Sequence, residues 1–550
     1  MNVRLCLLAS LPLLAAATPP VPRITPVPVS EATLEQVVRT LSSDEYEGRA
    51  PSTPGGEEKT VPYLIERFKA AGLLPGNKGS WTQDVPTVEI TARHVTGLAV
   101  TGGAKTLLFP YGNQMVVGSY RVTPETRIAD SELVFVGYGI NAPELGWNDY
   151  AGLDMRGKTA VILVNDPDYA MEGEAGPFKG RRMTYYGRWT YKFEEAARQG
   201  ATAALIVHDT FPAAYGWNVV ESSWSGAQYS VAKANDAMDQ TEANGWIQKP
   251  VAEAIFAAAG KNLAELTKAA GQQGFKPVPL GLKASLSFDN AIKRAMSHNV
   301  IGILPGAKRP DEYVLYTAHW DHLGRCRPDA TGDDICNGAL DNASGSAMLA
   351  ALAEANVKAG PADRSQIFLA VTLEESGLLG SEYYAQNPVY PLAKTVGGVN
   401  MDGVAPVGLS RDVSVTGGDK SDLTRYLNAT LTAMHLVQSP EKHPERGSYY
   451  RSDHFSLAKR GVPMLYVDGG EDLINGGRAA GAAYAKDYTE NRYHGPDDEY
   501  DPAWDWSGAM ADVRLSYRLG RMIAEGTDWP NWLPGDEFRR VRDESRAGQK

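Results

Sequence analysis

Two adjacent glutamates, Glu374 and Glu375, follow a short apolar segment that is rich in branched residues. This segment, 366–372, predicts a buried strand, and residues 377–385 predict a turn that opens a helix. In open α/β sheets, ligands bind where strands end and helices begin. Because neighbouring carboxylates repel each other, the pair needs separate roles or a shared cation.

Other potential metal ligands also follow predicted strands in the second half of the chain. Strands are predicted at 300–304, 313–317, 396–401 and 463–467, and helices at 344–357, 421–434 and 509–524. This alternation predicts an α/β fold, a mostly parallel mixed sheet covered by helices on both faces. The side chains at strand ends and in loops are His319, Asp321, Asp341, Asp402 and His494. Such a sheet brings these ends to one edge.

Histidine and carboxylate ligands together suit zinc. Two histidines and three carboxylates are too many for one tetrahedral ion. They suit two ions, with one carboxylate bridging and one histidine and one carboxylate terminal on each. One glutamate of the pair is then free to act as a base. Taken alone, Asp341 is better explained as a cap of the helix at 344–357, so the prediction depends on the whole set.

These motifs resemble the zinc aminopeptidase family with two co-catalytic zinc ions, which includes bacterial and vacuolar aminopeptidases and glutamate carboxypeptidase. The matching segments are His319-x-Asp321, 341–345, 374–381, Asp402, 452–454, 461–463 and 493–498. Their order agrees with the family over about 291–525, and family members also carry N-terminal helices with the loop Glu47-Gly48-Arg49. The resemblance implies the zinc exopeptidase fold.

The resemblance also implies two zinc ions and their ligands. One zinc would be held by His319, Asp341 and Asp402, and the other by Asp341, Glu375 and His494, with Asp341 bridging. The loop between His319 and Asp341 is longer than in the family pattern. This difference leaves the substrate specificity open but does not affect the expected metal ligands.

Three further residues receive catalytic or positioning roles from the resemblance. Glu374 would be the general base and acid that serves a metal-bound hydroxide. Asp321 would accept a hydrogen bond from the second ring nitrogen of His319 and fix its tautomer. Tyr493 would help to stabilise the oxyanion. His454, in the Ser-Asp-His segment, is interpreted as structural or pocket-lining.

The chain is long enough for several lobes, and its predicted secondary structure changes in character along its length. Residues 89–290 resemble the β-rich protease-associated domain that is inserted in some family members. The predicted organisation is a signal peptide at 1–17, N-terminal helices at 18–88, the inserted domain at 89–290, the zinc peptidase domain at 291–528 and a polar tail at 529–550.

Charge and cysteine content restrict the partners and the compartment. The net charge of −12 argues against a nucleic-acid partner, and no later segment is apolar enough to span a membrane. The apolar stretch 5–17 is typical of a signal peptide, so a secreted or periplasmic protein is predicted. In that compartment Cys326 and Cys336 are expected to form a disulfide, with half of a zinc site as the alternative.

The leading functional prediction is an aminopeptidase that hydrolyses N-terminal residues from peptides. A carboxypeptidase with the same metals is the alternative, and its cationic candidates are Arg411, Arg446, Arg451 and Arg478. Glutaminyl cyclisation and a non-catalytic, receptor-like binding protein are further alternatives. Receptor-like relatives lose metal ligands, whereas this chain retains all of them. The sequence leaves the oligomeric state open, a monomer included.

Overall fold

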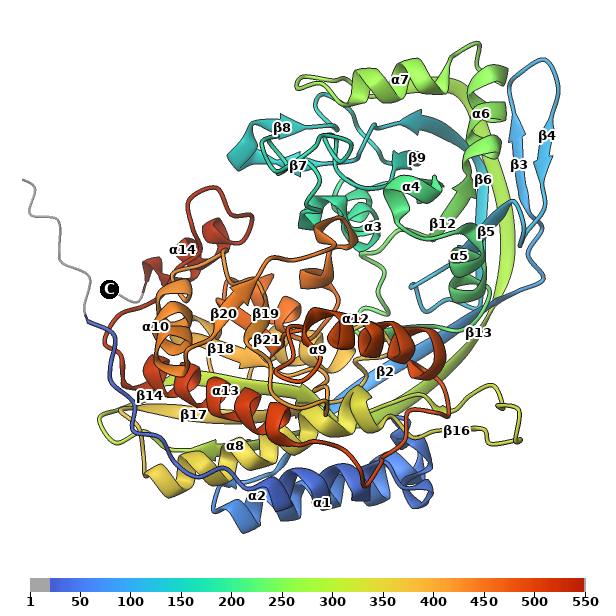
Figure 1. Cartoon of the computed structure of the whole chain (residues 1–550). Helices are drawn as coiled ribbons and strands as arrows, with labels where there is room; N and C mark the ends of the chain where they lie inside the picture. The colour runs from blue at the N-terminus through green and yellow to red at the C-terminus, as the bar shows by residue number, and fades with distance from the viewer. Residues whose placement is uncertain (1–19, 549–550) are drawn as a thin grey trace, which may run out of the picture.

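The computed structural model describes residues 20–548, which form two lobes (Figure 1). The predicted signal peptide at 1–17 lies outside the described residues. Within the described part, no helix combines the length and the apolar character that a membrane span requires.

The larger lobe contains the mixed sheet that carries the candidate site. Its strand order is β13-β17-β14-β18-β21-β19, and the four central strands run parallel. The strands are β13 (Val278–Leu304), β17 (Arg364–Val371), β14 (Arg309–His319), β18 (Thr395–Asn400), β21 (Met464–Gly469) and β19 (Asp412–Thr416). The predicted fold class, a mostly parallel mixed sheet flanked by helices, is therefore confirmed.

The register of the central strands determines where the site lies. His319 at the end of β14 pairs with Val371 at the end of β17, and Thr317 pairs with Asn400 at the end of β18. The chain therefore leaves these three strands at one edge of the sheet. The residues that follow them are brought together, as the strand-end argument predicts.

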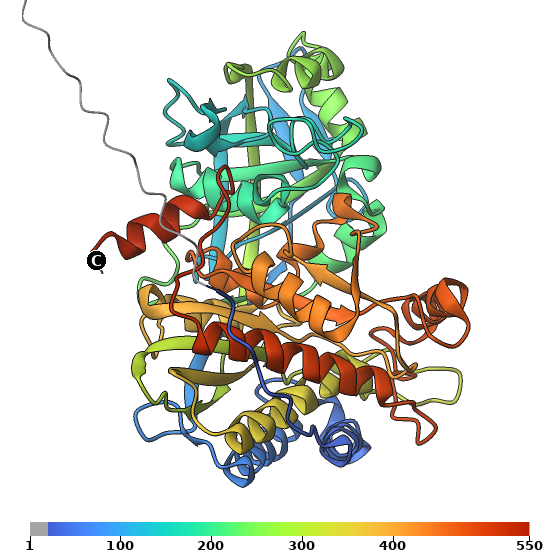
Figure 2. The same ribbon diagram turned by 60° about the vertical axis from the view of Figure 1, so that its left-hand side comes forward.

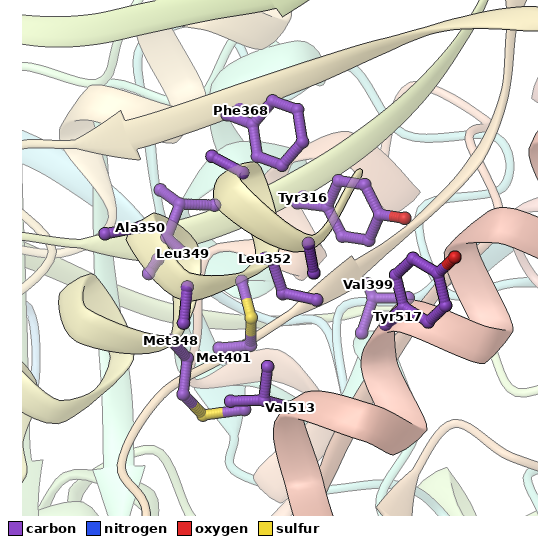
Figure 3. Close-up of a cluster of buried hydrophobic side chains, with 14 of the residues drawn as sticks. Tyr316, Met348, Leu349, Ala350, Leu352, Phe368, Val399, Met401, Val513 and Tyr517 are labelled. Atoms are coloured by element: carbon purple, nitrogen blue, oxygen red, sulfur yellow. The ribbon is translucent and has the colours of Figure 1, made fainter. Parts of the chain in front are cut away.

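Helices cover both faces of this sheet, because alternate side chains of each strand point to opposite faces. Tyr316 and Phe368 pack under α8 (Gly345–Ala359) and α13 (Ser507–Glu525), as Figure 3 shows. The N-terminal helices α1 (Glu31–Leu41) and α2 (Val61–Ala71) contact α8 from outside, so α8 is buried on almost all sides. The opposite face packs against α9 (Leu379–Gln386) and α11 (His454–Ala458).

The second lobe is built on residues 89–290 and has apolar cores of its own. Its parallel strands are β6 (Glu125–Phe135), β9 (Lys158–Leu163), β10 (Ala203–His208) and β12 (Ala243–Gln248). The strands β2 (Thr82–Arg93) and β13 pair continuously from 82 to 93 and from 289 to 300, and so run through both lobes (Figure 2). The predicted boundaries at 88 and 290 thus lie inside shared strands. That this lobe is a protease-associated domain stays a prediction.

The C-terminal tail, predicted only to be polar, ends in the helix α14 (Arg539–Ala547). The Arg542 side chain is buried, and it donates hydrogen bonds to the carbonyl oxygens of Leu392 at 3.4 Å and Val396 at 3.2 Å. The guanidinium of Arg546 lies 3.4 Å from the ring centre of Trp529. Charged side chains therefore attach α14 to the rest of the protein. A search for apolar residues at helical spacing does not predict such a helix.

The loop between His319 and Asp341 carries the Cys326–Cys336 disulfide, which confirms the predicted pair. Short strands β15 (Gly324–Arg325) and β16 (Ile335–Cys336) pair antiparallel on either side of it. The two cysteines are therefore unavailable as metal ligands.

Candidate metal centre

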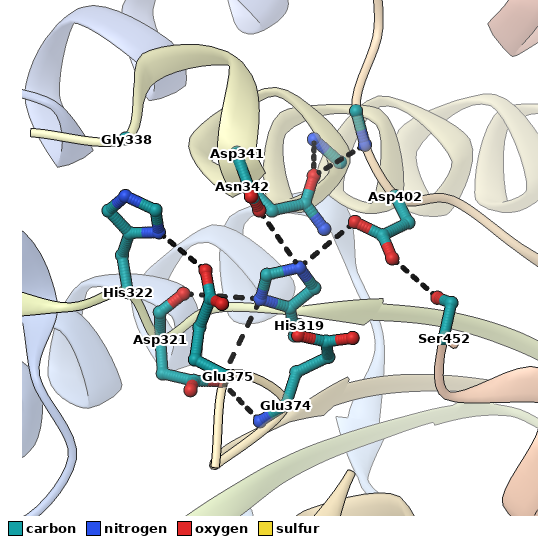
Figure 4. Close-up of polar contacts among 12 residues, drawn as sticks. His319, Asp321, His322, Gly338, Asp341, Asn342, Glu374, Glu375, Asp402 and Ser452 are labelled. Atoms are coloured by element: carbon teal, nitrogen blue, oxygen red, sulfur yellow. Dashed lines mark hydrogen bonds and ion pairs between the residues drawn. The ribbon is translucent and has the colours of Figure 1, made fainter. Parts of the chain in front are cut away.

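The residues predicted as metal ligands converge at one edge of the larger sheet (Figure 4). His319 ends β14, Glu375 follows β17 and Asp402 follows β18. Asp341 lies in the turn η5 (Ala339–Ser344), which leads into α8, and His494 lies in the loop before α13.

One group of donors surrounds the ring of His319. Its Nε2 lies 3.0 Å from Oδ1 of Asp402 and 3.3 Å from Oδ1 of Asp341. The Glu374 carboxylate belongs to the same cluster, because donor atoms of His319, Glu374 and Asp402 lie within 4.8 Å of one another. Burial disfavours the charged imidazole, but Asp402 and Glu374 outweigh it and raise the pKa of His319.

A second group of donors surrounds His494, on the other side of Asp341. Its Nε2 lies 3.2 Å from Oδ2 of Asp341 and 3.2 Å from Oε2 of Glu375. This buried nitrogen nevertheless makes no hydrogen bond in the described structure. Asp341 thus turns one oxygen towards each histidine, as a bridging ligand would.

The donor set fits two zinc ions. Zinc lies about 2.0–2.1 Å from nitrogen and oxygen ligands, so neighbouring ligand atoms in a tetrahedron are about 3.3–3.4 Å apart. The four distances that join the histidine nitrogens to the carboxylates range from 3.0 to 3.3 Å. Nε2 of His494 lies near two carboxylate oxygens but hydrogen-bonds to neither, which fits a cation between them better than a direct hydrogen bond. Mixed histidine and carboxylate donors are typical zinc ligands.

Glu374 differs from its neighbour, as the two-role prediction requires. Within residues 20–548 its carboxylate accepts no hydrogen bond, although it lies beside His319 and Asp402. Burial raises the pKa of Glu374 well above its usual value; His319 opposes this effect and Asp402 adds to it. An unligated carboxyl group with a raised pKa can both take up and release a proton.

Asp321 lies within hydrogen-bond distance of the second ring nitrogen of His319, as predicted, and its backbone oxygen makes the contact. Nδ1 of His319 lies 3.1 Å from the backbone oxygen of Asp321, whereas the Asp321 carboxylate is 3.8 Å from that nitrogen. The carboxylate instead accepts the backbone N–H of Glu374 at 3.1 Å. Asp321 therefore holds both the imidazole and the backbone of the glutamate pair.

Buried polar side chains orient the Asp402 and Asp341 loops. Ser452 donates to Oδ2 of Asp402 at 2.5 Å, which leaves Oδ1 to face His319. Oδ1 of Asn342 accepts the N–H of Gly345 at 2.8 Å and the N–H of Gly403 at 3.0 Å, so it joins the two loops. Asn342, and not Asp341, therefore caps the start of α8.

Tyr493 and His454 differ sharply in exposure. The ring of Tyr493 stacks on that of His494 with centroids 3.8 Å apart, and its side chain is 47% exposed. His454 is fully buried, with its ring 4.6 Å from that of Tyr449. Tyr493 can therefore meet a substrate, whereas His454 has a structural position, in agreement with its interpretation from the sequence.

His322 is a residue of the site that was not among the predicted site residues. Its Nδ1 lies 2.7 Å from Oε1 of Glu375, and its side chain is completely buried. Because Glu375 accepts this hydrogen bond, Oε2 is the oxygen left to face His494. The available signal was its place directly after the His319-x-Asp321 motif, where a second histidine lies close to the first.

Replacing His322 by alanine is expected to weaken the binding of one zinc ion about 10- to 100-fold, because partners of ligands typically contribute that much to metal affinity. Zinc titration of the metal-free protein in competition with a chromophoric chelator measures the affinity for each of the two ions. Ser452→Ala is the matched control, since Ser452 holds Asp402 on the other side. Equal weakening of both ions by His322→Ala would contradict the assignment of His322 to the Glu375 side.

Comparisons with known proteins match the region of the chain that contains the candidate metal centre. Residues 299–517 match the model of peptidase family M28. Aminopeptidase NAALADL1 of Mus musculus is 29% identical over 196 residues, which cover 30% of this chain and 25% of that protein. The glutamate carboxypeptidase 2 homolog of Caenorhabditis elegans is 29% identical over 202 residues, covering 34% of this chain and 24% of that protein. The chain thus spans about a quarter of the length of these relatives.

Among solved structures, an aminopeptidase from Aneurinibacillus sp. strain AM-1 aligns with a TM-score of 0.47 and 19% identity, over 91% of this chain and 95% of that one. A zinc aminopeptidase from Bacillus subtilis aligns with a TM-score of 0.42 and 17% identity, over 90% of this chain and 95% of that one. All five converging ligand candidates lie inside the matched range 299–517. The chain therefore contains a peptidase family M28 domain, and the candidate metal centre lies within it.

Proposed function

We propose that this chain is a di-zinc exopeptidase, and specifically an aminopeptidase that removes N-terminal residues from peptides. The observation that carries the proposal is the pair of donor groups that share Asp341. The family match and the names of the two relatives, an aminopeptidase and a glutamate carboxypeptidase homolog, support hydrolysis of a terminal peptide bond.

The residues divide the chemistry between them. His319, Asp341, Asp402, Glu375 and His494 would hold the two zinc ions, which supply Lewis-acid activation when bound. Glu374 takes the proton from the attacking water and delivers it to the leaving amine. That role agrees with a carboxylate that lies beside His319 and Asp402 without a hydrogen bond or ion pair to His319.

Tyr493 is proposed to stabilise the oxyanion. Half of its side chain is exposed, and its ring is held against His494. Burial, followed by the negative charge of Asp341, raises the pKa of Tyr493, so the phenol remains protonated at neutral pH. A protonated hydroxyl can donate a hydrogen bond to an oxygen that gains negative charge.

A carboxypeptidase is the second candidate, because Arg451 near Tyr493, and Arg188 near Arg451, form no ion pair among the described residues. Arg411 and Arg478 are paired with Asp472 and Asp412, at 3.2 and 3.3 Å. Arg451, directly before Ser452, forms no ion pair among the described residues. The pKa of Arg188 of the second lobe is lowered to about 10, mainly by burial, with Tyr215 opposing the decrease and nearby Arg451 adding to it. Such unpaired guanidinium groups could bind a substrate carboxylate.

One substrate panel separates the two candidates. It contains aminoacyl-arylamides, free peptides, N-acetylated peptides and peptides with a C-terminal amide, each assayed with zinc and with excess chelator. An aminopeptidase cleaves the arylamides and the C-terminal amides but not the acetylated peptides. A carboxypeptidase cleaves the acetylated peptides but not the peptides with a C-terminal amide. Cleavage that survives the chelator, or no cleavage of any substrate by the zinc-loaded protein, would contradict the proposed metallopeptidase.

Export to the periplasm or the extracellular medium is proposed together with this function. The support is the apolar leader at 5–17 and the disulfide between Cys326 and Cys336, because disulfides persist in oxidising compartments.

A further inference from the structure

Arg49 is a buried cation whose hydrogen bonds all go to backbone carbonyl groups. Its side chain is fully buried. Nε donates to the oxygen of Trp320 at 3.1 Å, and one terminal nitrogen donates to the oxygens of Leu41 at 2.7 Å and Asn337 at 2.6 Å. The other terminal nitrogen donates to the oxygen of Gly338 at 2.8 Å. Arg49 therefore holds the residue after His319 and the start of the segment that leads to Asp341.

Asp498 holds the other end of the same segment. Its carboxylate accepts the N–H groups of Leu340 at 3.0 Å and Asp341 at 3.1 Å, and its backbone oxygen accepts the N–H of Ala339 at 2.9 Å. Asp498 is itself almost completely buried. The positive side chain thus meets the carbonyl groups of segment 337–341, and the negative one meets its N–H groups.

We propose that Arg49 and Asp498 are positioning residues that together fix the backbone of segment 337–341 and thereby orient the bridging carboxylate of Asp341. The proposal rests on the metal centre proposed above. Because Asp341 serves both donor groups, loss of this orientation should weaken both zinc ions. The neighbouring partners differ: the His322 side chain hydrogen-bonds to Glu375 among the candidate ligands, and the Ser452 side chain hydrogen-bonds to Asp402.

Close backbone packing on both sides leaves the segment little freedom. A Cβ on Gly48 would lie 2.5 Å from the oxygen of Gly324 and 2.6 Å from that of Cys336. A Cβ on Gly338 would lie 2.2 Å from the oxygen of Asp341. Both glycines have positive φ, a conformation that favours glycine. The disulfide hairpin therefore packs directly against the loop that presents Arg49.

A buried charge is expensive, and a structural contact alone does not require one. Burial lowers the pKa of Arg49 to about 10, with Asp498 and Asp341 opposing the decrease, so the guanidinium remains charged at neutral pH. Only a multiple donor can engage four carbonyl groups at once. The charge also interacts favourably with the carboxylates of Asp341 and Glu375.

The test compares Arg49→Met and Asp498→Asn with the unchanged protein by zinc titration of the metal-free chain. Each variant should bind both ions about 10- to 100-fold more weakly. Arg49→Lys, which keeps the charge but not the geometry, should recover part of the affinity. Arg542→Met is the matched control, because Arg542 is equally buried and donates to backbone carbonyl groups far from the site. It should lower the melting temperature without changing zinc affinity.

The outcomes separate this proposal from the proposed function. If the unchanged protein binds no zinc tightly, the metal centre itself is wrong. If it binds two ions and both variants bind them with unchanged affinity, or each variant weakens a single ion, the positioning role is wrong. Should Arg49→Met fail to fold, Asp498→Asn still decides, because it keeps the size of the side chain and removes its charge.

Discussion

Replacing Glu374 by glutamine is expected to lower kcat about 10²- to 10⁴-fold, the usual contribution of a general acid–base group, while both zinc ions stay bound. The reason is geometric. Glu374 lies beside the donor atoms of His319 and Asp402, yet none of its oxygens is tied to either histidine by a hydrogen bond or an ion pair. Glutamine keeps the size of the side chain but cannot take up the proton.

Glu375→Gln is the matched control, because it makes the same chemical change one residue further along. Glu375 lies 3.2 Å from His494, so its replacement should release one zinc ion. Metal content per chain and kcat are measured on the same preparations. The prediction fails if Glu374→Gln loses an ion, or if it turns over at the normal rate with two ions bound.

The convergence of His319, the glutamate pair and Asp402 was predictable because each of them follows or ends a parallel strand. An apolar, branched segment followed by a polar turn identifies the end of a buried strand. Parallel pairing then places His319, the glutamate pair and Asp402 at one edge. The two roles of Glu374 and Glu375 follow from counting donors against the coordination number of zinc.

The contacts that orient the ligands were not predictable from such local patterns. Three of the four carbonyl groups that Arg49 bonds to lie 271 to 289 residues away in the sequence, and any residue type could supply them. For the same reason, the sequence does not show that Asp321 meets His319 through its backbone oxygen. Side-chain types therefore indicate the ligands but not their backbone partners.

The lobes and the tail illustrate a second limit. The sequence pattern changes at the two ends of segment 89–290, but β2 and β13 cross both ends as continuous strands. Strand pairing continues wherever backbone groups remain in register, whatever the composition. In α14 the buried contact is made by Arg542, which a hydrophobic pattern counts as polar. Long charged side chains can bury their stems while their ends bond to carbonyl groups.

Replacing Asp341 by asparagine is expected to remove both zinc ions and to lower kcat/KM at least as far as Glu374→Gln does. Each oxygen of Asp341 faces a different histidine, at 3.3 and 3.2 Å. Asparagine has the same shape but offers one neutral oxygen and one N–H₂ group, which cannot bind a cation. The change thus takes a ligand from both donor groups and removes the charge that they share.

The decisive measurement is zinc per chain after dialysis against a fixed, buffered zinc concentration. We expect fewer than one ion in Asp341→Asn, about one in Asp402→Asn and about one in Glu375→Gln, because only Asp341 contacts both histidines. The far-ultraviolet circular dichroism of each variant controls for folding. Retention of one tightly bound ion by Asp341→Asn would show that the carboxylate serves a single site, and the two-ion model with a bridging aspartate would then have to be abandoned.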